Sequence, residues 1–450
     1  MARIAVLDIG KTNLKLAVVD LTARAEVAVI TAPNRVLPGP PWPHFDVDAQ
    51  WRFLIDGLRR MVVAHAIDGV TVTTHGACCA LLDRDGNLAA PVLDYEHPGP
   101  DAQAAAYDAL RPDFAETGSP RLPLGLNVGA QLHYMLALDL GLQDRIAHVV
   151  TWPQYWGFRL TGRMACDLSS LGCHTDLWNP SAGRWSTLPA RLGLEGKMAP
   201  PQRPDAVLGV VSGLVQAETG LGPVPVRVGI HDSNASLLPH LLGRRPPFAV
   251  VSTGTWVISM AVGGRQVALD PARDTLVNVS AVGAPVPSAR FMGGRDYEVM
   301  RPEGAVRAGP ADAERVLAAG VMLLPSVTPG TGPFPQSAGR WTLEPATPEM
   351  REVALGYYLG LMTATCLDLI GAEGPVVVEG PMAANPWLRA MLAAATGRAV
   401  MASPAVTGTA IGAALLFHKG VLPDMAAPEP EAGDPRLAAY AARWRELAGR

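Results

Sequence analysis

The sequence contains no apolar run long enough to cross a membrane and no pair of cysteines spaced for a metal site. Its longest apolar stretch, residues 249–262, is interrupted by Thr253-Gly254-Thr255, whereas a spanning helix needs about 20 apolar residues. The five cysteines include no CxxC pair, so neither a zinc site nor a disulfide framework is indicated. Met1-Ala2-Arg3 leads directly into a strand pattern, without the pattern of a secretory leader. We therefore expect a cytoplasmic protein with reduced, buried thiols.

An excess of charge of either sign is also missing. The chain carries 37 Lys and Arg against 41 Asp and Glu, a net charge of -4. Basic runs such as Arg244-Arg245 are too short to form a stripe, so nucleic acid is not an expected partner. Hydrophobic residues make up 49% of the 450 residues, which is enough to bury the cores of two domains.

A Walker A loop is absent as well, although Gly10-Lys11-Thr12 looks like the end of one. The glycine that such a loop needs five residues before Gly10 is replaced by Ala5, inside an apolar run. The pattern is instead strand, turn, strand, with residues 4–7 and 14–19 flanking Asp8–Asn13. It predicts a β-hairpin with an acid, a glycine and polar side chains at its tip.

A similar pattern occurs about 240 residues later. The apolar segments 248–252 and 256–262 flank the turn Thr253-Gly254-Thr255. Two phosphate-sized hairpins suggest two related lobes that face one nucleotide. The boundary is expected near residues 244–247, which gives lobes of residues 1–243 and 244–450. Strands alternate with helices throughout, so an α/β fold with a mostly parallel sheet in each lobe is predicted.

The first hairpin tip carries chemistry suited to phosphate and metal. Asp8 can hold a magnesium ion, directly or through water. Gly10 lets the backbone approach phosphate closely, while Thr12 and Asn13 can donate hydrogen bonds. Lys11 supplies positive charge. The plainer interpretation is an ordinary Asp-Gly turn, and it stays open on these residues alone.

Three segments of the first lobe are candidates for substrate binding. Asp232 follows a strand and opens a helix, where it can serve as a general base or simply as a helix cap. His75-Gly76 follows another strand and can meet a polar substrate, although a lone histidine is often structural. Trp152 can stack on a sugar face, although aromatic residues at this spacing usually belong to a core.

In the second lobe, residues 379–385 follow a buried strand and precede a helix. Ligands of α/β folds commonly bind at such an edge, so a nucleoside can pack there, with a plain connecting loop as the alternative. The residues predicted to bind the nucleotide in the two lobes together are Gly10, Lys11, Thr12, Asn13, Thr253, Gly254, Gly380, Pro381 and Asn385.

With these residues assembled, the chain resembles the FGGY family of carbohydrate kinases over about residues 3–420. Asp8, Gly10 and Thr12 match the opening motif of the family, and residues 155–185 match its long, irregular LTG…D…T…W run. The segments 229–232, 252–255, 379–397 and 407–414 resemble its catalytic, phosphate and adenosine elements. Residues 231–235 and 291–295 are most similar to the rhamnulokinase and fuculokinase side of the family.

The resemblance implies two ribonuclease-H-like (actin-like ATPase) lobes with a cleft between them. It implies a sugar-binding first lobe using His75, Gly76, Trp152, His231 and Asp232, and a nucleotide-binding second lobe. The expected reaction is transfer of the γ-phosphate of ATP to a sugar hydroxyl, with Asp232 as the base and Mg2+ held near Asp8.

Two other classes stay in view: an actin- or chaperone-like ATPase, and a sugar-binding protein without catalysis. Ketopentoses, deoxyketohexoses, polyols and aldonates are all substrates that the resemblance allows. The expected partners are a small sugar and ATP, with no nucleic acid and no membrane. A homodimer is the assembly to test.

Overall fold

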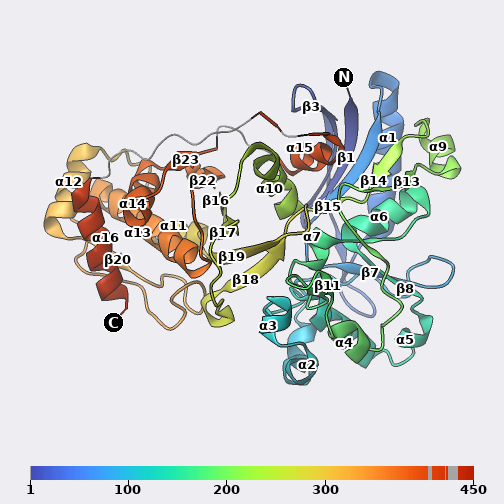
Figure 1. Cartoon of the computed structure of the whole chain (residues 1–450), viewed down its shortest axis with the longest axis horizontal. Coiled ribbons are helices and arrows are strands. Elements are labelled where there is room, and N and C mark those ends of the chain that lie inside the picture. The colour runs from blue at the N-terminus through green and yellow to red at the C-terminus, as the bar shows by residue number, and fades with distance from the viewer. Residues whose placement is uncertain (1, 404–407, 421, 424–433, 450) are drawn as a thin grey trace. The chain divides into compact units, whose positions relative to one another are not determined.

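The computed structural model describes residues 2–403, 408–420, 422–423 and 434–449. The chain divides into two compact units, each with its own sheet and helices (Figure 1). Unit 1 contains Met1–Gly243, Val277–Pro285 and Thr407–Pro423, and unit 2 contains the remainder. The sequence interpretation assigned all of residues 244–450 to one lobe. Two segments of that range instead belong to unit 1.

The main sheet of unit 1 has the strand order β13-β14-β6-β1-β2-β3, with β15 also paired to β6. Its strands are β1 (Arg3–Ile9), β2 (Asn13–Asp20), β3 (Ala25–Pro33), β6 (Gly69–Thr74), β13 (Val207–Val210), β14 (Pro225–Arg227) and β15 (Ile230–His231). β1 and β2 are antiparallel, with Asp8 opposite Lys15, so the predicted first hairpin is confirmed. β6 runs parallel to β1 and is buried along its whole length, as expected of a central strand.

The sheet of unit 2 has the order β18-β19-β17-β16-β22-β23. Its strands are β16 (Phe248–Thr253), β17 (Val257–Val262), β18 (Thr275–Val279), β19 (Pro285–Phe291), β22 (Val376–Glu379) and β23 (Val400–Ala402). β16 pairs antiparallel with β17 and parallel with β22. The second predicted hairpin is therefore confirmed, and β16 has the same two kinds of neighbour as β1.

Helices pack on both faces of the first sheet. The helices of unit 1 are α1 (Val47–Ala64), α2 (Ala104–Leu110), α3 (Phe114–Thr117), α4 (Val128–Leu138), α5 (Leu142–Arg145), α6 (Trp152–Thr161), α7 (Leu168–Leu171), α8 (Leu188–Arg191), α9 (Gly213–Thr219), α10 (Asp232–Gly243) and α15 (Thr409–Ala414). α1 and α6 lie on one face of the sheet, and α10 and α15 lie on the other. Because side chains alternate along β1, Ile4 and Val6 share one apolar cluster with α10 and α15, while Ala5 and Leu7 share another with α1 and α6. α10 and α15 approach closely at Gly412, where a Cβ would lie 1.9 Å from the Ala235 carbonyl oxygen.

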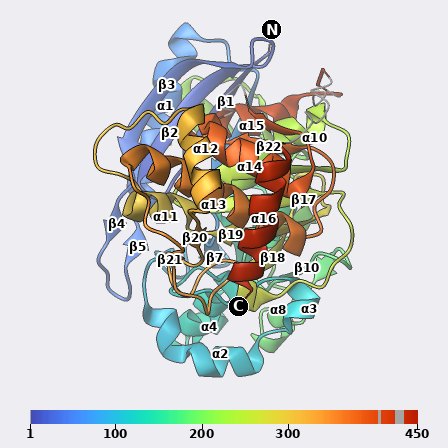
Figure 2. The same ribbon diagram turned by 90° about the vertical axis from the view of Figure 1, so that its left-hand side faces the viewer.

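The helices of unit 2 are α11 (Gly293–Met300), α12 (Pro310–Ala319), α13 (Pro348–Leu369), α14 (Pro386–Thr396) and α16 (Pro435–Ala448). α13 is buried over most of its circumference, as an apolar helix in the middle of a core should be. α12 and α16 lie beside each other on the side seen in Figure 2. Trp444 of α16 is buried and donates its indole N–H to the Leu323 carbonyl at 2.7 Å.

Two local features depart from regular strand pairing. The segment 226–230 is split into β14 and β15 at Gly229, which has a φ of 95°. A Cβ there would lie 2.7 Å from the Val72 carbonyl oxygen. Residues 81–89 form a short hairpin, in which the Ala89 N–H donates to the Leu81 carbonyl at 2.8 Å and the Asp83 N–H to the Asn87 carbonyl at 2.9 Å, while β7 (Cys79–Leu82) pairs on its other side with β8 (His148–Thr151). Within the described part of the chain, no helix is both long and apolar enough to cross a bilayer.

Candidate functional site

Asp8 lies in β1 and points to a residue from the far end of the chain. The Thr409 hydroxyl donates a hydrogen bond to its Oδ2. Burial raises the pKa of the Asp8 carboxyl, the bond from Thr409 offsets part of that rise, and the nearby negative charge of Asp232 raises the pKa further. The two carboxylates are therefore close enough to repel each other, and a cation between them would relieve that repulsion.

The tip of the first hairpin is fixed by its backbone and leaves polar side chains outside. The Gly10 N–H donates to the Asn13 carbonyl at 2.9 Å, and the Gly10 carbonyl accepts from Asn34 Nδ2 at 2.8 Å. Thr12 and Asn13 are exposed, 3.1 Å apart from Nδ2 to Oγ1. The tip thus offers the hydroxyl and amide donors that the sequence predicted.

Lys11 differs from its predicted use. Its ammonium group forms an ion pair with Asp94 and lies 3.2 Å from Glu96 Oε2. It also lies 4.9 Å and 5.2 Å from the ring centres of Tyr95 and Phe45. Because two carboxylates already neutralise it, Lys11 is not a free cation for phosphate.

His75 presents a buried acceptor that has no partner among the described residues. The side chain is only 7% exposed and lies between the Phe45 and Tyr95 rings, at centroid distances of 5.1 Å and 5.2 Å. Burial lowers the pKa of His75, so the ring is neutral at physiological pH. With Nδ1–H donating to the Gly76 carbonyl at 2.8 Å, Nε2 is left as an acceptor, and it meets no hydrogen-bond partner among the described residues.

Asp232 is held by one of its two carboxylate oxygens. Oδ1 lies 3.0 Å from His231 Nε2 and accepts the Ser233 N–H at 2.6 Å. The side chain remains 32% exposed, so Oδ2 can face a ligand. Gly76 packs directly against this group, because a Cβ on it would lie 2.9 Å from His231 Nε2. Unit 1 therefore brings together Gly76, His231 and Asp232, and their role in sugar binding stays a prediction.

Trp152 is different, because it belongs to the core. It is 1% exposed, stacked on Tyr155 at 5.6 Å and on Phe45 at 6.2 Å. Neither ring face is open to a sugar, so the stacking role expected from the sequence does not fit its burial. Its indole N–H has no hydrogen-bond partner in the part of the chain that is described, and Trp152 supports the site through Phe45.

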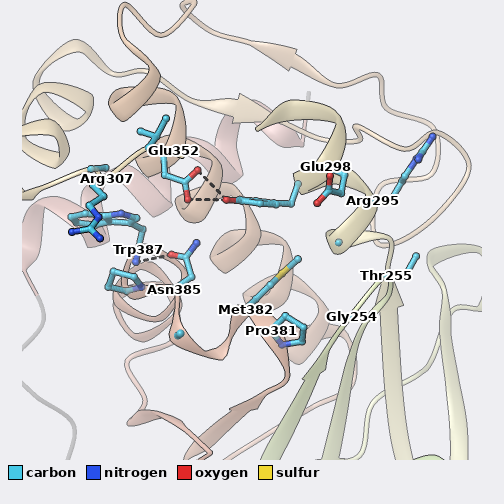
Figure 3. A pocket seen from close by; sticks show the side chains of 16 residues that line it. Gly254, Thr255, Arg295, Glu298, Arg307, Glu352, Pro381, Met382, Asn385 and Trp387 are labelled. Atoms are coloured by element: carbon cyan, nitrogen blue, oxygen red, sulfur yellow. Dashed lines mark hydrogen bonds between the residues drawn. The ribbon is translucent and has the colours of Figure 1, made fainter. Parts of the chain in front are cut away.

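Unit 2 contains a cavity of about 930 Å³ (Figure 3). Gly254, Thr255 and Arg295 lie toward one end, and Arg307, Asn385 and Trp387 lie toward the other. The remaining lining residues are Gly294, Tyr297, Glu298, Val306, Ala308, Glu352, Pro381, Met382, Ala384 and Pro386. A space of this size is typical of small-molecule and cofactor sites.

The Gly254 end is built from backbone. The Gly294 N–H donates to the Thr255 carbonyl at 3.1 Å, and a Cβ on Gly294 would lie 2.1 Å from the Gly254 carbonyl oxygen. Glycine at 294 thus lets the start of α11 pack against the β16–β17 turn. A helix N-terminus with a neighbouring cation, Arg295, is suited to bind phosphate groups.

Two predicted nucleotide residues support the cavity without lining it. The Thr253 hydroxyl donates to the Glu379 carbonyl and accepts from the Met382 N–H at 3.1 Å. Gly380 has a φ of 83°, and a Cβ on it would lie 2.1 Å from the Thr253 carbonyl oxygen. Of the other predicted residues, Gly254, Pro381 and Asn385 line the cavity. The Asn385 side chain also caps α14, accepting from two backbone N–H groups at 3.0 Å and 3.1 Å.

Sequence reasoning missed several lining residues. Tyr297 and Glu352 form a hydrogen bond of 3.1 Å across the cavity wall (Figure 3). Arg295 had a usable signal, because a glycine pair follows a strand immediately before it. In unit 1, sequence reasoning also missed Asp94, which pairs with Lys11, and Tyr95, which packs on His75. Their signal in the sequence is weaker, because it is only an acidic and aromatic cluster in a loop. Thr407, which opens the last of the family-like motifs, lies outside the described residues.

A solved carbohydrate kinase from Novosphingobium aromaticivorans is 35% identical to the chain, with a TM-score of 0.92, covering 100% of this chain and 99% of that one. The family profile described as "Carbohydrate kinase FGGY, C-terminal domain" matches residues 245–425. The chain belongs to the FGGY family of carbohydrate kinases. The family resemblance and the actin-like ATPase fold expected from the sequence are thereby confirmed.

Curated relatives of this FGGY member are more distant. The L-fuculokinase of Escherichia coli K12 is 26% identical over 277 residues, 57% of this chain and 56% of the relative. The rhamnulokinase of Bacteroides thetaiotaomicron is 26% identical over 237 residues, 50% of this chain and 47% of the relative. The chain thus spans about half the length of the curated relatives it matches.

Proposed function

We propose that this chain is an ATP-dependent sugar kinase that phosphorylates a hydroxyl of a ketose or deoxyketose of the L-rhamnulose, L-fuculose or xylulose kind. One observation carries the proposal. The Asp232 carboxylate is fixed through Oδ1 and leaves Oδ2 available, in the same unit as the unpartnered Nε2 of His75. A half-exposed base beside a buried acceptor suits a ligand that carries several hydroxyl groups.

In the proposed reaction, Asp232 accepts the proton of the sugar hydroxyl as that hydroxyl attacks the γ-phosphorus of ATP. His75 accepts a hydrogen bond from a second hydroxyl through Nε2 and so orients the sugar. Phosphoryl transfer has a loose transition state, so catalysis rests mainly on positioning and charge neutralisation. The fuculokinase and rhamnulokinase relatives support a deoxyketose as the sugar.

The cavity of unit 2 fits ATP in size and in the arrangement of its walls. We propose that the phosphates lie at Gly254, Thr255 and the start of α11, near Arg295. The nucleoside would lie toward Asn385 and Trp387, with Thr253 and Gly380 shaping the turn beneath it. Lys11, which pairs with Asp94, would belong to the sugar-binding unit 1 and would not contact the phosphates of ATP.

Mg2+ fits the donor set of unit 1. No cluster of three or more potential ligands occurs among the described residues, and Mg2+ usually takes one or two carboxylates with waters and substrate phosphates. Asp8 would hold it, near Asp232, whose charge raises the pKa of Asp8. When bound, Mg2+ neutralises charge on the phosphates. A cytoplasmic location and a homodimer remain predictions.

The test is a coupled ADP-release assay over a panel of ketoses, deoxyketoses, polyols and aldonates. We expect ADP release that depends on one class of sugar, with a phosphorylated sugar as the second product. ADP release that needs no sugar would favour the assembly ATPase. Sugar binding without any ADP release would favour a protein that binds sugar without catalysing its phosphorylation.

A further inference from the structure

A second titratable cluster lies directly behind Asp232. Cys173 Sγ is 3.5 Å from His231 Nε2, the same nitrogen that lies 3.0 Å from Asp232 Oδ1. The other ring nitrogen, Nδ1, faces the Asn234 amide at 3.4 Å. The imidazole is therefore held between a sulfur and a carboxylate, and Cys173 is itself only 3% exposed.

The segment that carries Cys173 is held in an unfavourable backbone conformation. His174 and Asp176 have φ values of 54° and 58°, a left-handed region that is unfavourable for residues other than glycine. Strain of this kind persists only where the surroundings enforce it, and it clusters at functional sites.

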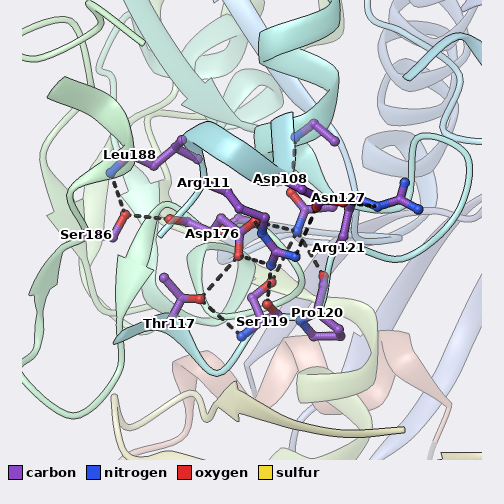
Figure 4. Close-up of polar contacts among 12 residues, drawn as sticks. Asp108, Arg111, Thr117, Ser119, Pro120, Arg121, Asn127, Asp176, Ser186 and Leu188 are labelled. Carbon is purple, nitrogen blue, oxygen red and sulfur yellow. Dashed lines mark hydrogen bonds and ion pairs between the residues drawn. The ribbon is translucent and has the colours of Figure 1, made fainter. Parts of the chain in front are cut away.

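The surroundings of this segment do enforce it (Figure 4). The Asp176 carboxylate accepts hydrogen bonds from Arg111, Tyr107, Asn127 and Thr117, at 2.7–3.2 Å. The first amides of α4 donate to the carbonyls of His174 and Thr175, both at 3.0 Å. On the other side, the His231 N–H donates to Ser169 Oγ at 3.1 Å. Both partners of the Sγ–Nε2 contact are thus fixed from outside.

Charge within this cluster favours an ion pair. Burial alone would raise the pKa of the Cys173 thiol, but His174 and His231 outweigh it and lower the pKa to about 5. Burial alone would likewise lower the pKa of His231, but Cys173 and then Asp232 raise it to about 10. The titratable groups that act on His231 are Cys173, Asp232, Asp167 and His75, whereas His174 acts on Cys173. The lowered pKa of Cys173 and the raised pKa of His231 both favour the form of the pair in which the thiol is deprotonated and the imidazole is protonated.

We propose that Cys173 is a positioning residue for Asp232: its sulfur anchors the His231 imidazolium, which fixes Oδ1 of Asp232 and leaves Oδ2 for the sugar hydroxyl. The inference rests on the proposed kinase function. A charge-assisted N–H donor is roughly twice as strong as a neutral one, so loss of the thiolate weakens the restraint on the base. The four other cysteines, Cys78, Cys79, Cys166 and Cys366, have a pKa raised by burial and carry no such charge.

The first measurement does not depend on activity. The ultraviolet absorbance of thiolate is compared at neutral pH between the wild-type protein and Cys173→Ser. We expect a difference equal to one thiolate per chain, because the remaining cysteines are protonated. An absent difference in a protein that remains an active kinase would overturn the positioning role while leaving the kinase function in place.

The second measurement uses the pH profile of turnover in Cys173→Ser and Cys173→Ala, with Cys166→Ala as the matched buried-cysteine control. We expect both Cys173 variants to lose about 10- to 100-fold in kcat, the range found when the partner that orients a reactive ligand is removed. Their turnover should also begin to fall at a lower pH than in the wild type, because removal of Cys173 removes the largest charge effect that raises the pKa of His231, while Asp232 and Asp167 still raise it. The control should keep the wild-type kcat and pH profile.

The outcomes separate the two proposals. Full activity in Cys173→Ser, or a lowered melting temperature with an unchanged pH profile, would make the residue merely structural and overturn the inference. A wild-type protein that phosphorylates no sugar in the panel would overturn the kinase function and the positioning role together. A thiolate signal with the expected kinetic loss supports both.

Discussion

The hydroxyl of Thr409 donates a hydrogen bond to the Asp8 carboxylate, although 401 residues separate the two in the chain. Thr409 begins α15, which packs on β1 and β2. Asp8 is therefore held between a hydroxyl donor and the repelling charge of Asp232. The charged form of the Asp8 carboxylate is therefore unfavourable in the ligand-free protein.

Asp8→Asn should raise the melting temperature of the ligand-free protein at neutral pH. Burial raises the pKa of Asp8 above 3.8, so the folded state binds the proton more tightly than the unfolded chain. Stability therefore falls as pH rises from 3.8 through the raised pKa, and removing the charge removes that loss. Thermal melts without nucleotide measure the effect, and a lower melting temperature would contradict it.

The matched control for Asp8→Asn is Asp139→Asn. The hydrogen bond from Arg145 lowers the pKa of the half-exposed Asp139, so its charge is favourable and its loss should not stabilise the protein.

Asp8→Asn should also weaken the use of Mg2+ by the enzyme. In activity assays, the Mg2+ concentration that gives half-maximal turnover should be about 10- to 100-fold higher in Asp8→Asn than in the wild type. An identical Mg2+ titration would remove Asp8 from the metal site.

Asp232→Asn should retain ATP binding and lose turnover by about 10²–10⁴-fold, the contribution of a positioned general base. The amide keeps the shape of the carboxylate but cannot accept the proton. ADP release measures turnover, and nucleotide-dependent thermal stabilisation measures binding. Asp139→Asn again serves as the control and should match the wild type, whereas unchanged turnover in Asp232→Asn would exclude it as the base.

His75→Phe should raise the KM for sugar about tenfold, since a hydroxyl left without its buried acceptor costs roughly 1–3 kcal/mol. Phenylalanine keeps the packing between Phe45 and Tyr95. Burial lowers the pKa of His75 below 6.5, so in the wild type the KM should rise as pH falls through that lowered pKa and protonation removes the acceptor. The variant should show no such rise, and parallel pH profiles would refute the role of Nε2.

Gly380→Ala should weaken nucleotide binding and lower the free energy of unfolding by about 1–3 kcal/mol. Its Cβ would lie 2.1 Å from the Thr253 carbonyl oxygen, so the turn below the cavity must shift. Gly320→Ala is the matched control, because Gly320 has a similar φ of 67° with no atom within 4 Å of the added Cβ. That control should cost about 1 kcal/mol from the backbone alone and leave ATP binding unchanged. Equal effects on binding would contradict the prediction.

Local patterns predicted both hairpins, because alternating apolar segments around a glycine turn are sufficient to specify them. The break at Gly229 was missed, because it depends on the close approach of the Val72 carbonyl, which no neighbour in sequence reveals. The place of α15 was missed for the same reason. Its partners, β1 and α10, are distant in the chain, and a single sequence does not encode that pairing in any short pattern.

The candidate site shows the same division. Asp8 and Asp232 could be found because each ends or follows a strand. The local pattern could not show that Lys11 pairs with Asp94, because Asp94 lies in a loop 83 residues later. It also could not show that Trp152 is buried in the core, because the spacing of aromatic residues does not reveal burial. Cys173 lies within the matched run of residues 155–185, but no residue pattern there marks it, and its significance depends on the distance from its sulfur to His231 Nε2.

The packing of α15 on β1 also has a consequence for synthesis on the ribosome. Ile4 and Val6 belong to an apolar cluster completed by Ala410, Ala413 and Leu415. α10 can cover part of their face of the first sheet early, but the part that packs against α15 stays uncovered until nearly the whole chain has been translated. A nascent chain stalled after residue 243 would present this surface to chaperones, and a fragment of residues 1–243 produced alone should aggregate.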